Sequence, residues 1–393
     1  MRLRNKSVYM DSHFIYNKPV TGKNFIGRKN QVQILTNLFS QSENVAIYEP
    51  HNAGKTSLLG QTFFNMKVAN QKFSTVEFSM LNIRTIADMM MRLGSAVLKD
   101  IGTTHADYAR AVQRFLGGTH FVFDPKNFES RGLILSLNWD IDDTDIAAIL
   151  SLPYLVAAER STRMYVVLDE FQNVMLTEDG DRVCRILEGI FKQTAPEMRK
   201  LVSYVFVGSE VNAMKEIFDH KRWFYRQVER VKLEPIDTKE IIDHVVKGFL
   251  ASGKVLDRDL LLGVCKLFRD NIWYVNHFAS ICDSMSKGYI MEPVLVDSLD
   301  TLVAIHEPRF IDTMNSLTTF QVCLLRAVLD GHTKFSSAEI ISRYNLNSSA
   351  NVRRLKDALC KKEIITFDED DNPEILDPLF EYWVKKKFFE IGG

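Results

Sequence analysis

The sequence predicts an α/β fold built on a parallel β-sheet, followed by two mostly helical regions. Short aliphatic and β-branched runs alternate with amphipathic helical stretches in the first part of the chain, at 45–47, 75–78, 164–168 and 201–207. Strands separated by helices pair in parallel, with helices on both faces of the sheet. From Pro235 onward helical periodicity dominates instead. The sheet is therefore expected in the N-terminal part of the fold.

Two further parts of the chain carry weaker strand patterns. Residues 132–139 have the pattern of an edge strand in a hairpin with 121–123, and we assign no chemistry to the surrounding segment 113–145. Near the C-terminus, three predicted helices precede a short strand pair at 364–367 and 374–376. The last part of the chain is therefore expected to form a small domain of its own.

Length and composition are those of a globular protein with two to three domains. The chain has 393 residues, of which 46% are hydrophobic and 25% charged, and a domain holds roughly 100–200 residues. The order of the elements predicts an α/β core at 1–234, a helical lid at 235–316 and a third domain at 317–393.

The charge and the cysteines exclude several classes of protein. The formal net charge is −1, so the whole molecule shows no electrostatic preference for nucleic acid or an anionic membrane. The five cysteines are odd in number and scattered without a Cys-x-x-Cys pair, which indicates reduced, mostly buried thiols and not a disulfide framework or a metal site.

The sequence also indicates a cytoplasmic protein without a membrane partner. Residues 1–14 contain Arg2, Arg4, Lys6 and Asp11 without an apolar run, unlike a secretory signal. No stretch approaches the roughly 18 consecutive apolar residues that span a bilayer.

The segment 49–56, Glu-Pro-His-Asn-Ala-Gly-Lys-Thr, follows a predicted strand and opens a predicted helix. Backbone N–H groups of such a loop, together with the helix dipole, bind phosphate. Gly54 allows close approach, Lys55 reaches the β- and γ-phosphates, and the Thr56 hydroxyl ligates Mg²⁺. The predicted nucleotide-binding residues are Pro50, His51, Asn52, Ala53, Gly54, Lys55, Thr56 and Ser57.

One residue departs from the phosphate-loop pattern. The first position, usually glycine, is Glu49, whose carboxylate must point away from the phosphates. The alternative is that Gly-Lys-Thr is a chance tripeptide or a decayed site.

A pair of carboxylates supports the nucleotide site. Asp169 and Glu170 end an apolar strand, Tyr-Val-Val-Leu, beside which the phosphate loop would lie in a parallel sheet. Asp169 is predicted to hold Mg²⁺, and Glu170 to orient and polarise the attacking water. The alternative is a solvated strand end, but its combination with Gly-Lys-Thr is much rarer by chance.

A third strand ends in Gly208 and Ser209 and is expected to lie between the other two. A polar group at its tip can contact the γ-phosphate or the water, so Ser209 is a candidate sensor. The alternative is that Ser209 only caps the helix that begins near Val211.

These residues resemble the archaeal ATPase family, a STAND-like branch near the AAA+ ATPases that includes relatives of the origin-recognition initiators. The resemblance covers nearly the whole chain, from Phe-Ile-Gly-Arg at 25–28, through 48–59 and Asp-Glu-Phe-Gln at 169–172, to an ending at 377–384. It implies a P-loop NTPase fold with a parallel sheet core, a helical lid and a C-terminal winged helix, with ATP and Mg²⁺ as cofactors.

The resemblance also suggests an arginine that acts on the γ-phosphate. Arg226 lies near the end of the core, where the family has Gly-Arg and this chain has Tyr225 before the arginine. Arg226 is therefore a candidate sensor or finger, in its own subunit or in a neighbouring one. A surface salt bridge is the alternative, and Arg222 and Arg230 compete for the role. The lid lacks the family's Gly-x-Pro segment, so no sensor residue is assigned there.

The resemblance places the recognition helix of the winged helix at 348–359, with Ser348 or Ser349 as its cap. Val352, Leu355 and Leu359 fall on one face of this helix. The polar residues that remain for solvent or DNA are Asn351, Arg353, Arg354 and Lys356.

Two functions remain open. The first is an ATP-driven conformational switch that hydrolyses slowly, because its catalytic parts assemble only on closure or oligomerisation, and whose winged helix docks a protein partner. The second is a DNA-binding initiator or transposition-type regulator controlled by ATP. The segment 317–393 carries 11 Lys and Arg against 12 Asp and Glu, so it is not basic as duplex binders usually are. A nucleotide kinase fits poorly, because the carboxylate pair suits water attack.

Overall fold

The structure is a computed structural model that describes residues 13–219 and 222–390. The segment on which the expectation of no secretory signal rests lies mostly outside these residues. The chain forms two compact units. We call Lys29–His51 with Thr62–Leu233 the sheet unit, and the described parts of Met1–Arg28, Asn52–Gln61 and Glu234–Gly393 the helical unit.

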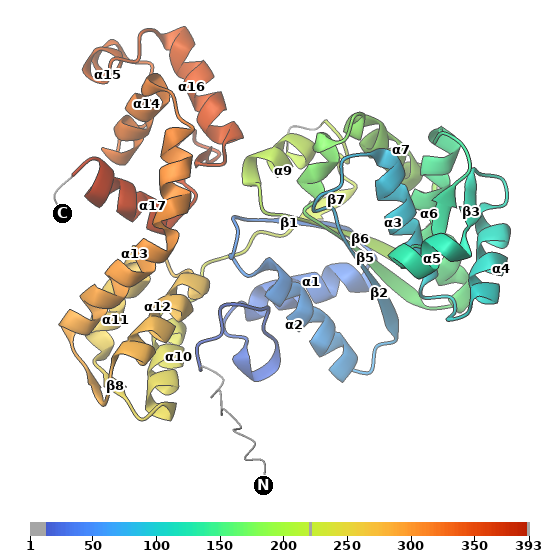
Figure 1. Cartoon of the computed structure of the whole chain (residues 1–393), viewed down its shortest axis with the longest axis horizontal. Coiled ribbons are helices and arrows are strands. Elements are labelled where there is room, and N and C mark those ends of the chain that lie inside the picture. The colour runs from blue at the N-terminus through green and yellow to red at the C-terminus, as the bar shows by residue number, and fades with distance from the viewer. Residues whose placement is uncertain (1–12, 220–221, 391–393) are drawn as a thin grey trace. The chain divides into compact units, whose positions relative to one another are not determined.

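The sheet unit contains a five-stranded sheet in the order β2-β5-β6-β1-β7. All neighbouring strands pair in parallel, which confirms the predicted α/β class (Figure 1). The strands are β1 (Asn44–Tyr48), β2 (Phe73–Ser79), β5 (Arg163–Asp169), β6 (Val202–Gly208) and β7 (Val228–Arg230). As predicted, β6 lies between β5 and β1, so all three carboxyl ends meet at one edge.

Helices α1 (Lys29–Ser40) and α2 (Lys55–Val68) cover one face of the sheet. The rings of Phe39 and Phe63 pack on Tyr165 of β5, with centroids 4.8 and 5.4 Å apart. Burial of large aromatic side chains is a major source of stability. This contact therefore helps to fix α1 and α2 on the sheet, and α2 is the helix that follows the phosphate-loop segment.

Helices α6 (Asp143–Arg160) and α7 (Gly180–Gln193) lie on the opposite face. The Tyr204 hydroxyl on β6 donates to the Leu150 carbonyl at 2.6 Å, and the ring of Phe191 lies 5.4 Å from the ring of Tyr204. Burial raises the pKa of Tyr204, and the neighbouring Tyr154 phenol adds to this effect, so the Tyr204 hydroxyl remains a donor. Both faces of the sheet are thus covered. The other helical segments of this unit are α3 (Ile86–Leu98), α4 (His105–Leu116), α5 (Pro125–Arg131), η2 (Phe171–Leu176), α8 (Pro196–Arg199) and α9 (Val211–Phe218).

The segment without assigned chemistry forms a separate two-stranded sheet. Strands β3 (Phe121–Phe123) and β4 (Leu135–Leu137) pair antiparallel, with α5 (Pro125–Arg131) between them. The predicted pairing is confirmed, but the strand is not an edge of the five-stranded sheet. The Leu135 N–H donates to the Ser95 hydroxyl of α3 at 3.0 Å, so this small sheet packs on the helical layer.

The helical unit begins with η1 (Gly22–Asn24) and continues with the lid. The lid elements are α10 (Thr238–Ala251), β8 (Val255–Leu256), α11 (Arg258–Leu267), α12 (Ile272–Met285), β9 (Tyr289–Ile290) and α13 (Glu292–Asn315). Asp237, Asp257 and Asn271 each cap a helix by accepting a backbone N–H, which satisfies donors that a helix start leaves unpaired. The helical periodicity predicted for this region is confirmed.

The last elements have the predicted order of three helices and a strand pair, and a further helix follows that was not predicted. They are α14 (Thr319–Leu329), α15 (Ala338–Arg343), α16 (Ser349–Lys361), β10 (Ile365–Phe367), β11 (Pro373–Ile375), α17 (Pro378–Trp383) and the turn η3 (Val384–Phe388). Ser348 caps α16 by accepting the Asn351 N–H at 3.2 Å, and Val352, Leu355 and Leu359 are buried, as predicted.

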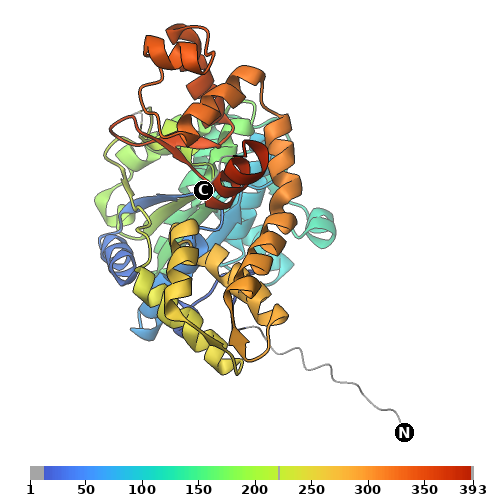
Figure 2. The same cartoon turned by 90° about the vertical axis from the view of Figure 1, so that its left-hand side faces the viewer.

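One continuous hydrophobic core runs through the helical unit, from Phe14 to Val384. Helix α13 runs from the lid to the last elements in both views (Figures 1 and 2). Its Phe310 lies against Trp383 of α17, with ring centroids 5.6 Å apart, and its Arg309 pairs with Asp377 at 2.8 Å. The lid and the C-terminal domain therefore share their interior.

Two expectations about the whole chain can be compared with the described residues. Within 13–219 and 222–390, no helix combines the length and the apolar composition needed to cross a bilayer. All five cysteines are free thiols, and Cys184, Cys265 and Cys282 are buried, in agreement with the predicted reduced state.

Candidate nucleotide site

The phosphate-loop segment lies between β1 and α2, as predicted. Asn52 and Gly54 have φ angles of 63° and 95°, in the region that glycine and asparagine tolerate best. A Cβ at position 54 would lie 2.8 Å from Arg28 Nη1, so a larger residue would be strained by its backbone and would displace Arg28. Lys55 is buried and begins α2, whereas Thr56 is exposed. The backbone thus has the strained turn that a loop cradling an anion requires.

Arg28, the last residue of the Phe-Ile-Gly-Arg motif, contacts the phosphate loop, although no role was predicted for it. Its Nη1 donates to the Ala53 carbonyl at 2.6 Å, and its Nε donates to the Glu234 carbonyl at 3.2 Å. Gly27 has a φ of 65°, and a Cβ there would lie 2.6 Å from Ile236. The guanidinium therefore links the phosphate loop to the start of the lid within the helical unit. The Phe-Ile-Gly-Arg motif was the signal that could have revealed it.

Ser57 has a structural contact in addition to its predicted place near nucleotide. Its hydroxyl accepts the Val20 N–H at 3.1 Å, and the Gln61 side chain accepts the Gly22 N–H at 2.7 Å. Two successive turns of α2 thus anchor the segment that precedes the first helix.

In the sheet unit, three predicted residues meet at the ends of neighbouring strands. The Ser209 hydroxyl lies 2.6 Å from Glu170 Oε2 and 3.0 Å from His51 Nε2. Gln172 Nε2 also donates to Glu170 Oε2, at 2.5 Å. We call His51, Ser209 and Glu170 the strand-end row. It joins the ends of β1, β6 and β5 in the order of the strands.

Ser209 does not cap the helix that follows it. The N-cap of α9 is Glu210, which makes no side-chain cap hydrogen bond, and the Ser209 hydroxyl is directed to Glu170 instead. The capping alternative is therefore wrong, and contact with a γ-phosphate remains a prediction.

Glu170 holds an unusual backbone conformation next to Asp169. Its φ is 53°, which costs a residue with a side chain roughly 1–3 kcal/mol unless its surroundings hold it. The Glu170 N–H donates to Asp169 Oδ1 at 3.1 Å. Close by, Gly208 approaches so tightly that an added Cβ would lie 2.7 Å from Gln172 Oε1. Contacts from neighbouring strand ends thus hold the carboxylate in place.

The atypical Glu49 has a partner within the sheet unit. Its Oε1 accepts the Leu233 N–H at 3.3 Å. The residue that departs from the phosphate-loop pattern therefore ties the end of β1 to the chain that follows β7.

The three candidate arginines differ in their partners. Arg222 pairs with Asp181, and Arg230 pairs with Asp219 at 3.1 Å. Arg226 is exposed, has a φ of 56° and makes no ion pair with any described residue; its guanidinium lies 5.2 Å from the neighbouring tyrosine ring. The salt-bridge alternative thus fits Arg222 and Arg230, and the role of Arg226 remains a prediction.

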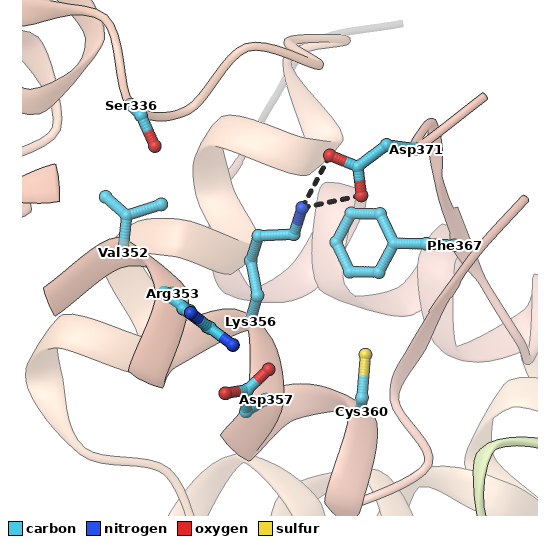
Figure 3. A pocket seen from close by; sticks show the side chains of 8 residues that line it. All are labelled: Ser336, Val352, Arg353, Lys356, Asp357, Cys360, Phe367 and Asp371. Carbon is cyan, nitrogen blue, oxygen red and sulfur yellow. Dashed lines mark hydrogen bonds and ion pairs between the residues drawn. The ribbon is translucent and has the colours of Figure 1, made fainter. Parts of the chain in front are cut away.

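The recognition helix α16 differs from its prediction at two positions. Lys356 Nζ lies 2.7 and 2.8 Å from the two Asp371 oxygens and 4.0 Å from the centre of the Phe367 ring (Figure 3). The Asn351 amide donates to the Leu346 carbonyl at 3.0 Å. Both side chains are therefore engaged within their own domain, not left free for solvent or DNA. Asp371 lies in the turn between β10 and β11, and we call this hairpin the wing; Leu346 lies in the loop before α16. Helical periodicity cannot show contacts with either segment.

Arg353 and Arg354 are exposed, as predicted. Arg353 lines a pocket of about 390 Å³ between α16 and the wing, together with Lys356, Asp357 and Asp371. Two cations and two carboxylates line this pocket, so it presents no uniformly basic surface.

The arrangement of strands, loop and C-terminal elements defines the class of fold. A parallel sheet, a glycine-containing loop between β1 and α2, and an acidic pair at the end of β5 are the features of P-loop NTPases. Residues 308–386 match a family described as a probable winged helix domain. The chain thus has a P-loop NTPase fold with a C-terminal winged helix, in agreement with the predicted fold class.

Solved structures of archaeal ATPases share this fold. A Walker-type ATPase of Pyrococcus abyssi is similar with a TM-score of 0.65 at 13% identity, over 95% of this chain and 99% of that one. The ADP form of the ORC2 protein of Aeropyrum pernix is similar with a TM-score of 0.53 at 11% identity, over 93% of each chain. The implied resemblance to archaeal-type ATPases is confirmed at the level of the fold. No curated protein matches the sequence.

Proposed function

We propose that this protein binds ATP·Mg²⁺, hydrolyses ATP slowly and acts as a nucleotide-controlled conformational switch whose winged helix docks a partner. The observation that carries the proposal is the strand-end row, in which Glu170 Oε2 lies 2.6 Å from the Ser209 hydroxyl at the edge where β5, β6 and β1 end. Ligands of open parallel sheets bind at the carboxyl ends of their strands.

The phosphate-loop residues fit a triphosphate. Gly54 has a φ that suits a loop of inward N–H groups, and α2, with 14 residues, begins directly at Lys55. Such a helix start attracts anions. In the proposal, backbone groups of Pro50–Ser57 and the Lys55 ammonium hold the phosphates, and Thr56 and Asp169 ligate Mg²⁺. Solved ORC2 structures of this fold are described as ADP and ADPNP complexes, which supports the choice of nucleotide.

Glu170 is proposed to orient and polarise the water that attacks the γ-phosphate. ATP supplies the phosphoanhydride bond that this water cleaves. Ser209 and Arg226 are proposed to sense the γ-phosphate. Because Arg226 is exposed, it is free to act in its own subunit or, in a homo-oligomer, on a neighbour. Catalytic parts that assemble only on closure or association make turnover slow.

The proposed domains are the α/β core at 1–234, the lid at 235–316 and the winged helix at 317–393, in a cytoplasmic protein. Because the lid and the winged helix share one core, a change of lid position would carry the winged helix with it. This continuity supports a switch that reports its nucleotide state to a partner.

ATP-regulated DNA binding, as in an initiator or a transposition-type regulator, is the second candidate. The winged-helix match and the exposed Arg353 and Arg354 support it. The pairing of Lys356 with Asp371 argues against DNA binding. Of the three cations in the segment 351–356 of α16, Arg353, Arg354 and Lys356, the last is already neutralised by a carboxylate of the wing. A protein partner is therefore preferred.

Glu170→Gln tests the proposed ATPase. A residue that only prepares water is dispensable for binding, so calorimetric titration should give an ATP·Mg²⁺ affinity within about threefold of the parent. General-base catalysis contributes roughly 10²–10⁴-fold, so single-turnover hydrolysis should slow by about 100-fold or more.

Glu178→Gln is the matched control, because Glu178 is exposed on the same unit, and it should hydrolyse ATP at the parental rate. Unchanged hydrolysis in Glu170→Gln would transfer the catalytic role to another residue. No binding of ATP·Mg²⁺ by the parent would refute the proposed function itself.

A further inference from the structure

We propose that His51 is a positioning residue for Glu170 and acts through Ser209. This inference rests on the proposed ATPase function and deepens it. His51 belongs to the phosphate-loop sequence and was predicted to bind nucleotide. Its side chain instead contacts Ser209, with Nε2 3.0 Å from the hydroxyl oxygen.

The chemistry of the groups sets the direction of the hydrogen bonds. An ionised carboxylate only accepts, so the Ser209 hydroxyl donates its proton to Glu170 Oε2 at 2.6 Å. The serine oxygen can then only accept from His51, which requires a proton on Nε2. His51 thus acts as the donor that holds the Ser209 hydroxyl toward Glu170, and hydrogen bonds in such a chain strengthen one another.

The two oxygens of Glu170 are treated differently. Oε2 receives both Ser209 and Gln172, at 2.6 and 2.5 Å. Oε1 accepts no hydrogen bond from any described residue. The clamp on Oε2 therefore orients the carboxylate and leaves Oε1 as the atom that takes the proton of the attacking water.

The order of the strands makes the contact possible. Strand β6 lies between β5 and β1, so Ser209 stands between the carboxylate at the end of β5 and the histidine after β1. His51 is exposed and precedes Asn52, whose φ of 63° marks the turn of the loop. The row therefore joins the loop proposed to bind phosphate to the carboxylate proposed to act on water.

The test compares two replacements of His51. Phenylalanine keeps a flat ring but donates no hydrogen bond, whereas glutamine keeps an N–H donor. His51→Phe should lower kcat by about tenfold, because small misplacements of a catalytic group are costly, while KM and the calorimetric ATP affinity stay within about twofold. His51→Gln should restore kcat to within about threefold of the parent. Loss of ATP affinity in His51→Phe, or an equal loss of kcat in both variants, would overturn the proposal.

Ser209→Ala and the double variant complete the cycle. If His51 acts only through Ser209, adding His51→Phe to Ser209→Ala should lower kcat no further, since coupled residues are not additive. Additive losses would mean that His51 acts independently. His105→Phe is the matched control, since His105 is exposed on α4, and its kcat should equal that of the parent.

A structural readout separates failure of this inference from failure of the ATPase. Long-range nitrogen–proton NMR of nucleotide-free protein should show the His51 proton on Nε2, with signals that shift in Ser209→Ala. A proton on Nδ1 alone would exclude the donor row whether or not ATP is hydrolysed. If the proton is on Nε2 but the protein does not bind ATP, the hydrogen bond between His51 and Ser209 is confirmed and its proposed role in catalysis is refuted.

Discussion

The strand-end row and the surface of α16 both bring polar side chains together, but by different means. In the row, His51, Ser209 and Glu170 come from the ends of three parallel strands, whose order fixes their proximity. On α16, Lys356 is fixed by Asp371 from the wing. Strand topology can be inferred from the order of elements, whereas pairing across a helix surface depends on which neighbour reaches it.

The two regions also differ in what they leave available. In the row, the contacts fix one carboxylate oxygen and leave the other open, which suits a group that acts on a ligand. On α16, the wing neutralises a cation beside a run of four acidic residues, 368–371. This local neutralisation is the reason why we propose a protein partner for this face in preference to the phosphates of duplex DNA.

The largest effect is expected from removing the main cation of the phosphate loop. Lys55→Ala should reduce ATP·Mg²⁺ affinity by roughly 100-fold or more in calorimetric titration, because a charge-assisted phosphate contact is lost. The circular dichroism spectrum should not change. Lys239→Ala, an exposed change on α10, is the control. If Lys55→Ala keeps the parental affinity for ATP·Mg²⁺, the phosphate loop is not the nucleotide site. The strand-end row would then have no ligand on which to act.

A smaller effect is expected on the winged-helix side. If this face docks a protein, replacing Arg353 and Arg354 together with alanine should change duplex affinity by less than about threefold at either of two salt concentrations, measured by fluorescence anisotropy. If α16 enters the major groove, the loss should be several kcal/mol, at roughly 1–3 kcal/mol per good contact. Steeply salt-dependent binding by the ATP-bound parent, lost in this variant, would establish the DNA-binding alternative.

Asp371→Asn sharpens this test. It releases Lys356 without removing a cation, so a DNA-binding face should gain affinity, and a protein-docking face should remain indifferent to DNA. Asp370→Asn, on the same exposed run but without the contact to Lys356, is the matched control.

The smallest effect concerns acid stability of the lid. Burial, and the repulsion that a second protonated ring would meet at His306, lower the pKa of His277 to about 4, and burial also lowers the pKa of His306. Both rings stay neutral in the folded chain. The free energy of unfolding should therefore be highest above pH 6.5 and fall as the pH decreases toward 4, by up to about 1.4 kcal/mol per pH unit for each histidine.

His277→Phe should flatten this pH dependence in urea titrations, and it removes a buried Nδ1 that has no hydrogen bond among the described residues. His105→Phe, on the sheet unit, should leave the slope unchanged. An equal slope in parent and His277→Phe would mean that other groups control acid unfolding. The same titrations give the pH range in which the protein remains folded, and therefore the range in which the strand-end row and the surface of α16 can be studied.

Much of the fold could be predicted from the sequence because its signals are local. The strands of the sheet are short aliphatic runs, and the phosphate loop lies at a strand-to-helix transition, so their order predicts a parallel sheet. Ser348 and the apolar residues of α16 follow from capping and helical spacing. Asp169, Glu170 and Ser209 could be placed at one edge because parallel strands end together.

The remaining features depend on contacts between distant residues. Nothing around His51 indicates that its ring reaches Ser209, which lies beyond β6 in the chain. The role of Arg28 depends on the carbonyls of Ala53 and Glu234, and backbone acceptors leave no pattern in a sequence. The sequence could predict strand β4, but not that β3 and β4 form a sheet apart from the five-stranded one. A strand of an isolated pair and an edge strand of a larger sheet have the same pattern of alternating apolar and polar residues.

The common interior of the lid and the winged helix limits how the gene can be divided. Phe310 of α13 packs on Phe380 and Trp383 of α17, and Trp383 donates from its indole nitrogen to Glu307 at 2.8 Å. A fragment that ends after the lid would expose these aromatic rings to water and aggregate. A winged helix expressed from residue 317 would lack the helix on which its last segment rests. A fragment that begins at Glu234 would in turn lack Phe14, which belongs to the same core and packs on Phe249 of α10 with ring centroids 4.7 Å apart. Crystallisation, partner screening and fusion proteins therefore need the lid and the winged helix together with the segment around Phe14.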